Sequence, residues 1–320
     1  MAACLAAPVL AVLTGTGLAQ TSTRTEWFRK AQWGVLMHYL GSTRLTPEEW
    51  NRRIDDFDVE GLARQLESAH ARYFFITLGQ NSGHFLSPNK TYDRITGNNP
   101  SKCSRRDLVA DLYTALDKRG IKLLVYLPSG PPDEDKVAME AFEWRKGPYR
   151  NAEFQRKWEQ VIEEWSERWG SKVAGWWFDG CYWPNAMYRS AEAPNFASFA
   201  IAARKGNPNS IVAFNRGVVM PILSQTPEED YTAGETENPS NIDVGEFWRD
   251  GAQTQMLSYL GRGWSSGAPR FTDDEAAALT KRLVDKGVVV TWDVPHDVNG
   301  LIGEAFVKQL GAIGQALGAR

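Results

Sequence analysis

The 320-residue sequence is poor in cysteine and histidine, with three and four residues of these types. Neither CxxC nor HExxH occurs, and no similar ligand spacing is visible. We therefore expect no bound metal, no cofactor and no disulfide framework. Cys103 and Cys181 follow the N-terminal segment, so one disulfide between them stays possible. The net charge of −3 shows no basic excess, which gives no support to nucleic acid or an anionic membrane as a partner.

Charge is absent from the first twenty residues, MAACLAAPVLAVLTGTGLAQ. The segment is small and apolar, and Gly17-Leu18-Ala19 suits cleavage before Gln20. It is short for a membrane span, is interrupted by Pro8 and by glycines, and is not followed by a stop-transfer cluster of charges. We interpret residues 1–19 as a signal peptide that lacks the usual basic start. We expect a secreted or periplasmic protein with no membrane span after cleavage.

Tryptophan, in contrast, is abundant, with 13 residues. Indole and phenol rings stack well on the apolar faces of sugars, so this abundance favours a carbohydrate partner, although an aromatic core would also explain it. Hydrophobic residues make up 42% of the sequence and charged residues 23%. These fractions are typical of a soluble globular protein with a sizeable core.

Residues 25–320 contain no repeat, low-complexity block or long linker. Apolar runs of strand length alternate there with amphipathic segments of helix length, a pattern typical of a parallel sheet buried under helices. The runs are WGVLMHY from Trp33, RYFFITLG from Arg72, IKLLVYLP from Ile121, VAGWWFDG from Val173, SIVAFNRG from Ser210, DYTAGE from Asp230, QMLSYLG from Gln255 and GVVVTWDV from Gly287.

The helical segments show residues typical of helix starts and ends, and apolar residues that repeat along one face. Asp107 precedes LVADLYTALDKRG, which stops at Gly120, and Trp158, Ile162 and Trp165 recur at helical spacing in a later segment. Eight strands separated mainly by helices predict one α/β domain of the (β/α)₈ TIM-barrel type over residues 25–320. No good helix lies between the sixth and seventh runs, so we expect an irregular barrel. We expect no separate C-terminal β-sandwich.

Active sites of such barrels form at the carboxyl ends of the strands. The residues at these ends are His38, Gln80, Asn81, Ser129, Asp179, Asn215, Arg216, Glu235, Trp292, Asp293 and His296. Asp179 stands among aromatic residues in VAGWWFDGCYW, where a carboxylate is costly unless it is hydrogen-bonded, paired or used. Asp179 and Glu235 form the best pair for the two carboxylates of a glycoside hydrolase. Since side chains alternate along a strand, at most one of Trp176 and Trp177 lines the pocket.

Several segments resemble glycoside hydrolase family 29, the α-L-fucosidases, in the family's order over roughly residues 25–310. They are WFRKAQWGVLMHYLGS, FDVEGLARQLESAHARYFFITLG, RRDLVADLYTALDKRGIKLLVYLPSG, GWWFDG and GVVVTWDVPHDVNGLI. The resemblance implies that Asp179 is the nucleophile, that Glu235 in DYTAGETENP is the acid/base, and that His38 binds the sugar. Glu246 is the second candidate for the acid/base and Glu237 the third.

The sequence departs from the family after the second strand, where the family has two adjacent histidines. Gln80 and Asn81 occupy those positions, and His84 follows nearby. Amides donate and accept hydrogen bonds to hydroxyls but carry no charge. We expect Gln80, Asn81, His84, Trp177 and Trp292 to bind substrate together with His38.

The sequence therefore predicts a secreted retaining exo-glycosidase acting on a terminal fucose or related sugar. Two alternatives stay open. One is a glycosidase with a different sugar specificity, and the other is a carbohydrate-binding barrel with weak or no turnover.

Overall fold

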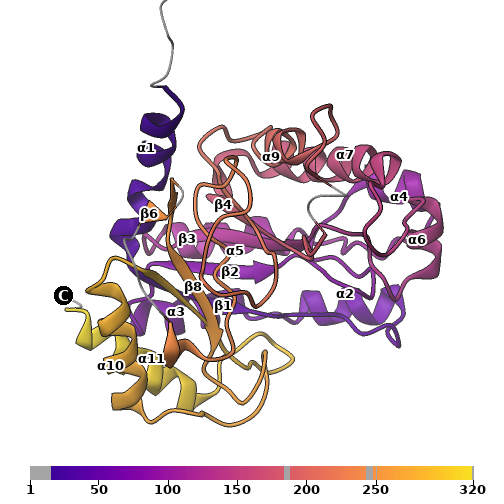
Figure 1. The fold of residues 1–320 in the computed structure, drawn as a ribbon. Helices are drawn as coiled ribbons and strands as arrows, with labels where there is room; N and C mark the ends of the chain where they lie inside the picture. Colours follow the sequence, from indigo (N-terminus) through magenta and orange to yellow (C-terminus); the bar gives the residue numbers. More distant parts are fainter. Residues whose placement is uncertain (1–15, 184–187, 243–247, 250, 319–320) are drawn as a thin grey trace, which may run out of the picture.

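A computed structural model describes residues 16–183, 188–242, 248–249 and 251–318 (Figure 1). Seven parallel strands form one curled sheet in the order β5-β4-β3-β2-β1-β9-β8. The strands are β1 (Trp33–Met37), β2 (Tyr73–Thr77), β3 (Lys122–Pro128), β4 (Gly175–Asp179), β5 (Ile211–Phe214), β8 (Gln255–Tyr259) and β9 (Val289–Asp293). A short antiparallel hairpin, β6 (Trp248–Arg249) and β7 (Ala252–Gln253), lies outside this sheet. The α/β class and the parallel sheet are confirmed.

The predicted strand DYTAGE is not formed, and the barrel is not closed by regular strands. Residues 230–236, which are all described, pair with β7 and β8 through isolated parallel bridges, Tyr231 with Gln253 and Glu235 with Leu257. Gly234 explains the irregularity, because its φ of +65° is left-handed and a Cβ there would lie 1.8 Å from the Gln255 carbonyl oxygen. We call residues 230–236 the seam.

The two faces of the sheet bury different sets of side chains. The concave face holds a cluster that includes Tyr73, Phe75, Tyr126 and Trp177. Trp176 belongs to the other cluster, which packs between the sheet and its helices. The strand alternation expected for the two tryptophans is therefore present, and it directs Trp177 inward.

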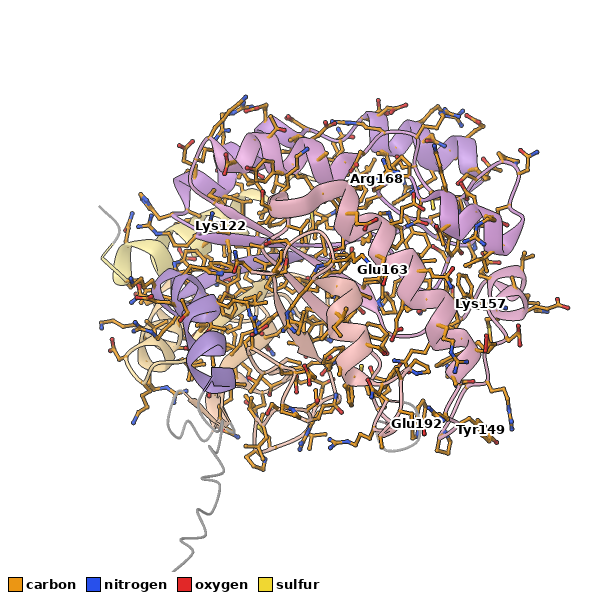
Figure 2. All side chains as sticks on the ribbon, turned by 90° about the horizontal axis from the view of Figure 1, so that it is seen from above. Lys122, Tyr149, Lys157, Glu163, Arg168 and Glu192 are labelled. Atoms are coloured by element: carbon orange, nitrogen blue, oxygen red, sulfur yellow. The ribbon has the colours of Figure 1, made fainter. Side chains whose placement is uncertain are left out.

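The helices cover the convex face and both edges. They are α2 (Pro47–Asp55), α3 (Val59–Ser68), α4 (Lys90–Thr96), α5 (Leu108–Asp117), α6 (Lys136–Ala141), α7 (Ala152–Trp169), α9 (Phe196–Ala203), α10 (Asp273–Val284) and α11 (Glu304–Ala316). The Asp107 side chain accepts a hydrogen bond from the Ala110 N–H and so caps α5, as the sequence predicts. In α7, Trp158 and Trp165 are buried, while Lys157 and Arg168 lie along the outside of the same helix (Figure 2).

Helix α1 (Thr16–Ala31) begins at the first described residue and projects from the edge of the domain (Figure 1). Most of the predicted signal peptide, residues 1–19, lies outside the described residues. Within the described part of the chain, no helix combines the length and the hydropathy that a membrane crossing requires. Cys103 and Cys181 are both buried free thiols, so the disulfide left open above is not formed.

Candidate active site

The carboxyl ends of the strands surround a cavity of about 300 Å³. Its walls include His38 after β1, Gln80 after β2, Tyr126 in β3, Trp177 and Asp179 in β4, and Glu235 in the seam. Trp264 and Ser265, which follow β8, close one side. The size is at the low end for ligand pockets, which are commonly about 300–1,000 Å³, and suits one small ring.

Asp179 is held by several hydrogen-bond donors at the end of β4. Its Oδ2 accepts from the Tyr126 hydroxyl at 2.6 Å, and its Oδ1 accepts from Asn215 Nδ2 at 2.8 Å. The Gly180 N–H at 2.8 Å and the Tyr182 hydroxyl at 3.3 Å also reach Oδ1. These four donors hold the carboxylate in one orientation. The carboxylate among rings is thus hydrogen-bonded, and it still lines the cavity.

Asn215 joins the two candidate catalytic carboxylates. Its Nδ2 donates to Asp179 Oδ1 at 2.8 Å and to Glu235 Oε2 at 2.6 Å. Because both oxygens accept a hydrogen bond from the same nitrogen, Asp179 Oδ1 and Glu235 Oε2 are at most about 5.4 Å apart. Retaining glycosidases hold their two carboxyl groups about 5–5.5 Å apart, whereas inverting ones need about 6.5–9.5 Å.

Glu235 is partly buried, and its surroundings favour the protonated form. Burial raises the pKa of Glu235 above its ordinary value, and the nearby charge of Asp179 acts in the same direction. The hydrogen bond from Asn215 opposes this shift without cancelling it. The site therefore pairs a carboxylate surrounded by donors with a carboxyl group that retains its proton more readily, which is the division of roles that general acid catalysis needs.

His38 is oriented by a buried ion pair. Its Nδ1 lies 2.7 Å from Asp293 Oδ1, and the Ser265 N–H donates to the other oxygen of that fully buried carboxylate. Burial alone lowers the pKa of His38, but the carboxylate of Asp293, with the charges of Asp179 and Glu235, raises it above the ordinary value. The ring therefore presents Nε2 to the cavity as a donor suited to a sugar hydroxyl.

Gln80 and Asn81 take different positions. Gln80 Nε2 donates to the Tyr126 hydroxyl at 2.7 Å, and that hydroxyl donates to Asp179. Gln80 thus supports Asp179 through Tyr126 and also lines the cavity. Asn81 is exposed and lines a neighbouring cavity that Asp179 and Gln80 also line. Trp177 lines the main cavity and stacks on Tyr126, with ring centroids 5.2 Å apart.

Two predicted substrate contacts are corrected. His84 is buried, its Nε2 lies 3.0 Å from the Leu45 carbonyl oxygen, and its ring packs on Trp50. Trp292 is fully buried between the sheet and α10, where its indole N–H donates to Thr280 Oγ1. Strand alternation explains the second error, since Trp292 precedes the inward-facing Asp293 and therefore faces outward.

Sequence reasoning missed Tyr126, Trp264 and Tyr182. Tyr126 is two residues from the end of its strand and lies opposite Trp177 in the neighbouring strand, so the two side chains point to the same face of the sheet. The register of these two strands could have identified it. Trp264 and Tyr182 lie in loops, where no periodic pattern identifies them. Of the competing acids, Glu246 falls outside the described residues, and Glu237 does not line the cavity.

A larger cavity, of about 600 Å³, lies at the opposite end of the sheet beside α1. Arg24, Trp27, Lys122 and Asn207 are among its lining residues, which include no carboxylate. Among the described residues, no group of three or more His, Cys, Asp or Glu side chains could hold a metal ion. The carboxylate pair therefore marks the smaller cavity as the place for acid–base chemistry.

A pair of carboxylates in an aromatic cavity at the strand ends is the arrangement typical of glycoside hydrolases. The family model described as Alpha-L-fucosidase matches residues 47–319, and the chain belongs to this family. It is a divergent member, since Gln80 and Asn81 replace the paired histidines. No curated protein sequence is similar enough to this chain to be matched.

Solved structures share the fold at low sequence identity. The endo-fucoidan hydrolase MfFcnA4 of glycoside hydrolase family 107 has a TM-score of 0.74 and 17% identity, over 95% of this chain and 55% of that one. This chain thus spans about half the length of that structure. The endo-fucoidan hydrolase P5AFcnA has a TM-score of 0.72 and 16% identity, over 91% of this chain and 92% of that one. The α-L-fucosidase AlfC from Lactobacillus casei, bound to α-L-fucose, has a TM-score of 0.63 and 15% identity, over 91% of this chain and 97% of that one.

Proposed function

We propose that the protein is a retaining exo-glycoside hydrolase that removes a terminal α-L-fucose or a closely related sugar. The observation that carries this proposal is the shared hydrogen bonding of Asn215, which keeps Asp179 Oδ1 and Glu235 Oε2 at most about 5.4 Å apart, closer than inverting enzymes need. Membership of the α-L-fucosidase family supports fucose as the sugar. The fucosidase and fucoidan hydrolase names of the structural neighbours agree with it.

The reaction proceeds in two displacements. Asp179 attacks the anomeric carbon while Glu235 gives its proton to the departing glycosidic oxygen, so that a glycosyl ester forms on Asp179 and the alcohol leaves. Glu235, now ionised, takes a proton from water as that water attacks the same carbon. The sugar departs with its original configuration, and Asp179 and Glu235 return to their starting states.

The surrounding residues position the sugar and the nucleophile. His38, oriented by Asp293, donates to a ring hydroxyl, and Trp177 offers an aromatic wall. Gln80 keeps the Tyr126 hydroxyl directed at Asp179, so the position that holds a histidine in the family is used here for the nucleophile. This change favours a preference for sugar hydroxyls that differs from the preference of family members with the paired histidines.

Chemical rescue tests the assignment of the nucleophile. Asp179→Gly with azide should yield a glycosyl azide of inverted configuration from 4-nitrophenyl α-L-fucoside, because azide replaces the missing carboxylate from the same face. Wild-type hydrolysis followed by NMR should release the sugar with retained configuration. Unimpaired hydrolysis by Asp179→Ala would exclude Asp179 as the nucleophile.

The acid/base is tested by leaving-group dependence. Glu235→Gln should lose activity on substrates with a basic leaving group and retain much of it on an activated aryl fucoside, which needs no proton. Glu237→Gln is the matched control and should behave like wild type on both substrates. If only Glu237→Gln showed this dependence on the leaving group, Glu237 and not Glu235 would be the acid/base.

A carbohydrate-binding protein without turnover is the second candidate, favoured by the loss of the paired histidines. Sugar binding by wild type and Asp179→Ala, without release of nitrophenol by either across a panel of aryl glycosides, would establish it. We also propose that the protein is secreted or periplasmic, from the composition of residues 1–19. Sequencing the N-terminus of the exported protein should find Gln20.

A further inference from the structure

A second cavity adjoins the first at Asp179 and Gln80. It has a volume of about 260 Å³, and both residues line both cavities. Its other walls include Asn81, Asp133, Trp144, Lys146, Tyr182 and Trp183. Glu235 lines the first cavity but not the second. The two cavities therefore share Asp179 and Gln80 but not Glu235.

The aromatic lining of the second cavity is available for contact. Trp144 is partly buried, and its edge-on contact with Phe154 at 4.6 Å holds it in place. Gly130 faces the Trp144 ring, where an added Cβ would lie 3.3 Å away, so the glycine keeps this space open. The Tyr182 side chain is 49% exposed, and its hydroxyl reaches Asp179 at 3.3 Å.

Polar groups accompany the rings. Lys146 Nζ donates to Asp133 Oδ2 at 2.9 Å, an ion pair that supplies both donors and acceptors at the cavity wall. The exposed amide of Asn81 adds one more of each kind. Aromatic faces combined with amide, ammonium and carboxylate groups match the alternating apolar and hydroxyl surfaces of a sugar ring.

The side on which this cavity lies determines which part of a substrate it takes. In a retaining displacement the nucleophile and the departing oxygen lie on opposite faces of the anomeric carbon, and the acid stands beside the departing oxygen. The second cavity borders Asp179 and not Glu235, so it lacks the acid that should stand beside the departing oxygen. Its occupant is a part of the substrate that stays joined to the attacked sugar.

We propose that the second cavity binds a further saccharide unit attached to the sugar that Asp179 attacks, so that the protein cleaves within a glycan chain as well as at its end. This inference rests on the proposed function and extends it. The covalent chemistry is the same hydrolysis: one glycosidic bond breaks, and water supplies the hydroxyl and the proton to the two products.

The test compares 4-nitrophenyl α-L-fucoside with 4-nitrophenyl glycosides of fucose disaccharides that cover each ring hydroxyl as the linkage point. With at least one disaccharide, wild type should release nitrophenol and the intact disaccharide, with a kcat/KM about five- to tenfold above that for the monosaccharide. Release of single fucose with no intact disaccharide from any of them would overturn the proposal.

Variants of the cavity wall locate the effect. Trp144→Ala should abolish the gain while leaving kcat/KM for the monosaccharide unchanged, and Lys146→Ala, a surface change that does not threaten folding, should reduce the gain. Tyr149→Ala is the matched control, since Tyr149 is an exposed ring of the same loop that does not line the cavity. A gain that survives both cavity variants would place the second unit elsewhere and contradict the proposal.

Binding separates this inference from the proposed function. If wild type hydrolyses no fucoside, the proposed function fails, and calorimetric titration with free fucose and the free disaccharides still tests the cavity. Tighter binding of a disaccharide that is lost in Trp144→Ala would support the second subsite. Equal binding of mono- and disaccharides would overturn it. Turnover of the monosaccharide without any disaccharide gain rejects the subsite alone.

Discussion

Asp179 and Glu235 face the same cavity but stand on parts of the sheet that are built differently. Asp179 ends β4, which is paired along its length with β3 and β5, so the backbone ladder positions its side chain. Glu235 lies in the seam, which makes only isolated bridges to its neighbours. Asp179, the proposed nucleophile, is thus held by regular secondary structure, whereas Glu235, the proposed acid/base, depends on side chains that replace the missing ladder.

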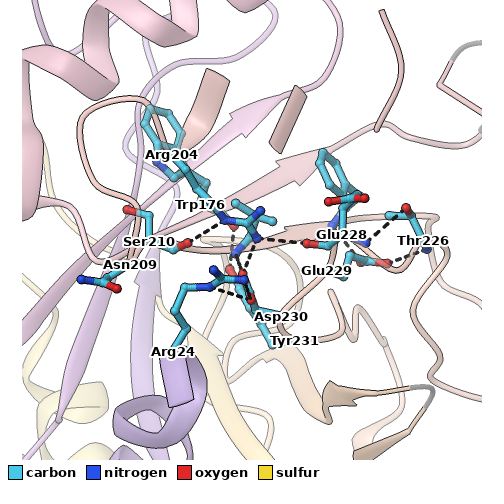
Figure 3. A network of polar contacts seen from close by, with 12 residues as sticks. Arg24, Trp176, Arg204, Asn209, Ser210, Thr226, Glu228, Glu229, Asp230 and Tyr231 are labelled. Carbon is cyan, nitrogen blue, oxygen red and sulfur yellow. Dashed lines mark hydrogen bonds and ion pairs between the residues drawn. The ribbon is translucent and has the colours of Figure 1, made fainter. Parts of the chain in front are cut away.

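The strongest of these side-chain contacts gathers at Asp230, at the start of the seam (Figure 3). Its fully buried carboxylate accepts two hydrogen bonds from Arg24 at 3.1 and 3.0 Å and one from Arg204 at 2.6 Å. It also accepts from the Val212 N–H at 2.9 Å, which couples the seam to β5. Because Arg24 belongs to α1, this helix is fastened to the segment that carries Glu235. One carboxylate of the pair is therefore fixed by the sheet, and the segment that carries the other is fixed by buried charge.

The largest effect is expected at Asp179. Asp179→Asn should lower kcat by roughly 10⁴-fold, the order seen when a member of a catalytic unit is removed. The amide can keep partners such as Tyr126, so stability should change little. Initial rates with an aryl fucoside and a thermal melt measure both. A large fall in melting temperature with little loss of activity would show that Asp179 serves the fold.

Asp230→Ala should weaken the seam and the fold together. Removal of the shared carboxylate leaves Arg24 and Arg204 without their buried partner, and breaking a buried ion pair in this way costs about 3–5 kcal/mol. Urea unfolding should show this loss, and kcat should fall because Glu235 loses its anchor. Arg105→Ala, which removes an exposed pair with Glu48, should leave the urea midpoint nearly unchanged. Equal midpoints for both variants would contradict the role given to Asp230.

Asn215→Ala addresses the link between the two regions. The variant removes charge-assisted hydrogen bonds to both carboxylates, each worth about 1.5–3 kcal/mol, so kcat should fall roughly tenfold to a hundredfold. Asn209→Ala, an amide at the other end of the same strand, is the matched control. If the two variants have the same kcat, the bridge does not organise the site.

The smallest effect is a displacement of the pH profile. Because Glu235 must be protonated to act as the acid and its pKa is raised, the alkaline limb of kcat/KM should lie above the ordinary value of a glutamate, about 4.3. Asn215→Ala should move this limb to still higher pH, since the lost hydrogen bond favours the ionised form. On an activated substrate the limb should disappear in Glu235→Gln. A limb that persists there belongs to another group.

Much of the regular architecture was predictable because it follows from local patterns. Buried strands read as continuous apolar runs, and the caps of helices such as α5 are local, so seven of the eight predicted strands and the helices between them could be located. Asp179 could be placed at a strand end for the same reason. The sixth predicted strand, DYTAGE, was wrong because Gly234 adopts a left-handed conformation to approach Gln255, a contact between distant segments.

The sequence by itself determined the α/β class, the parallel strands and the acidic residues at their ends, since periodicity and chain direction are properties of neighbouring residues. Only the tertiary structure decided that Trp177 faces the cavity and Trp292 faces α10, because alternation does not say which parity is inward. It also decided that Asn215 bridges Asp179 and Glu235 and that Arg24 holds Asp230, since these contacts depend on how the sheet curls. Residues far apart in the chain meet there, and no local pattern carries that information.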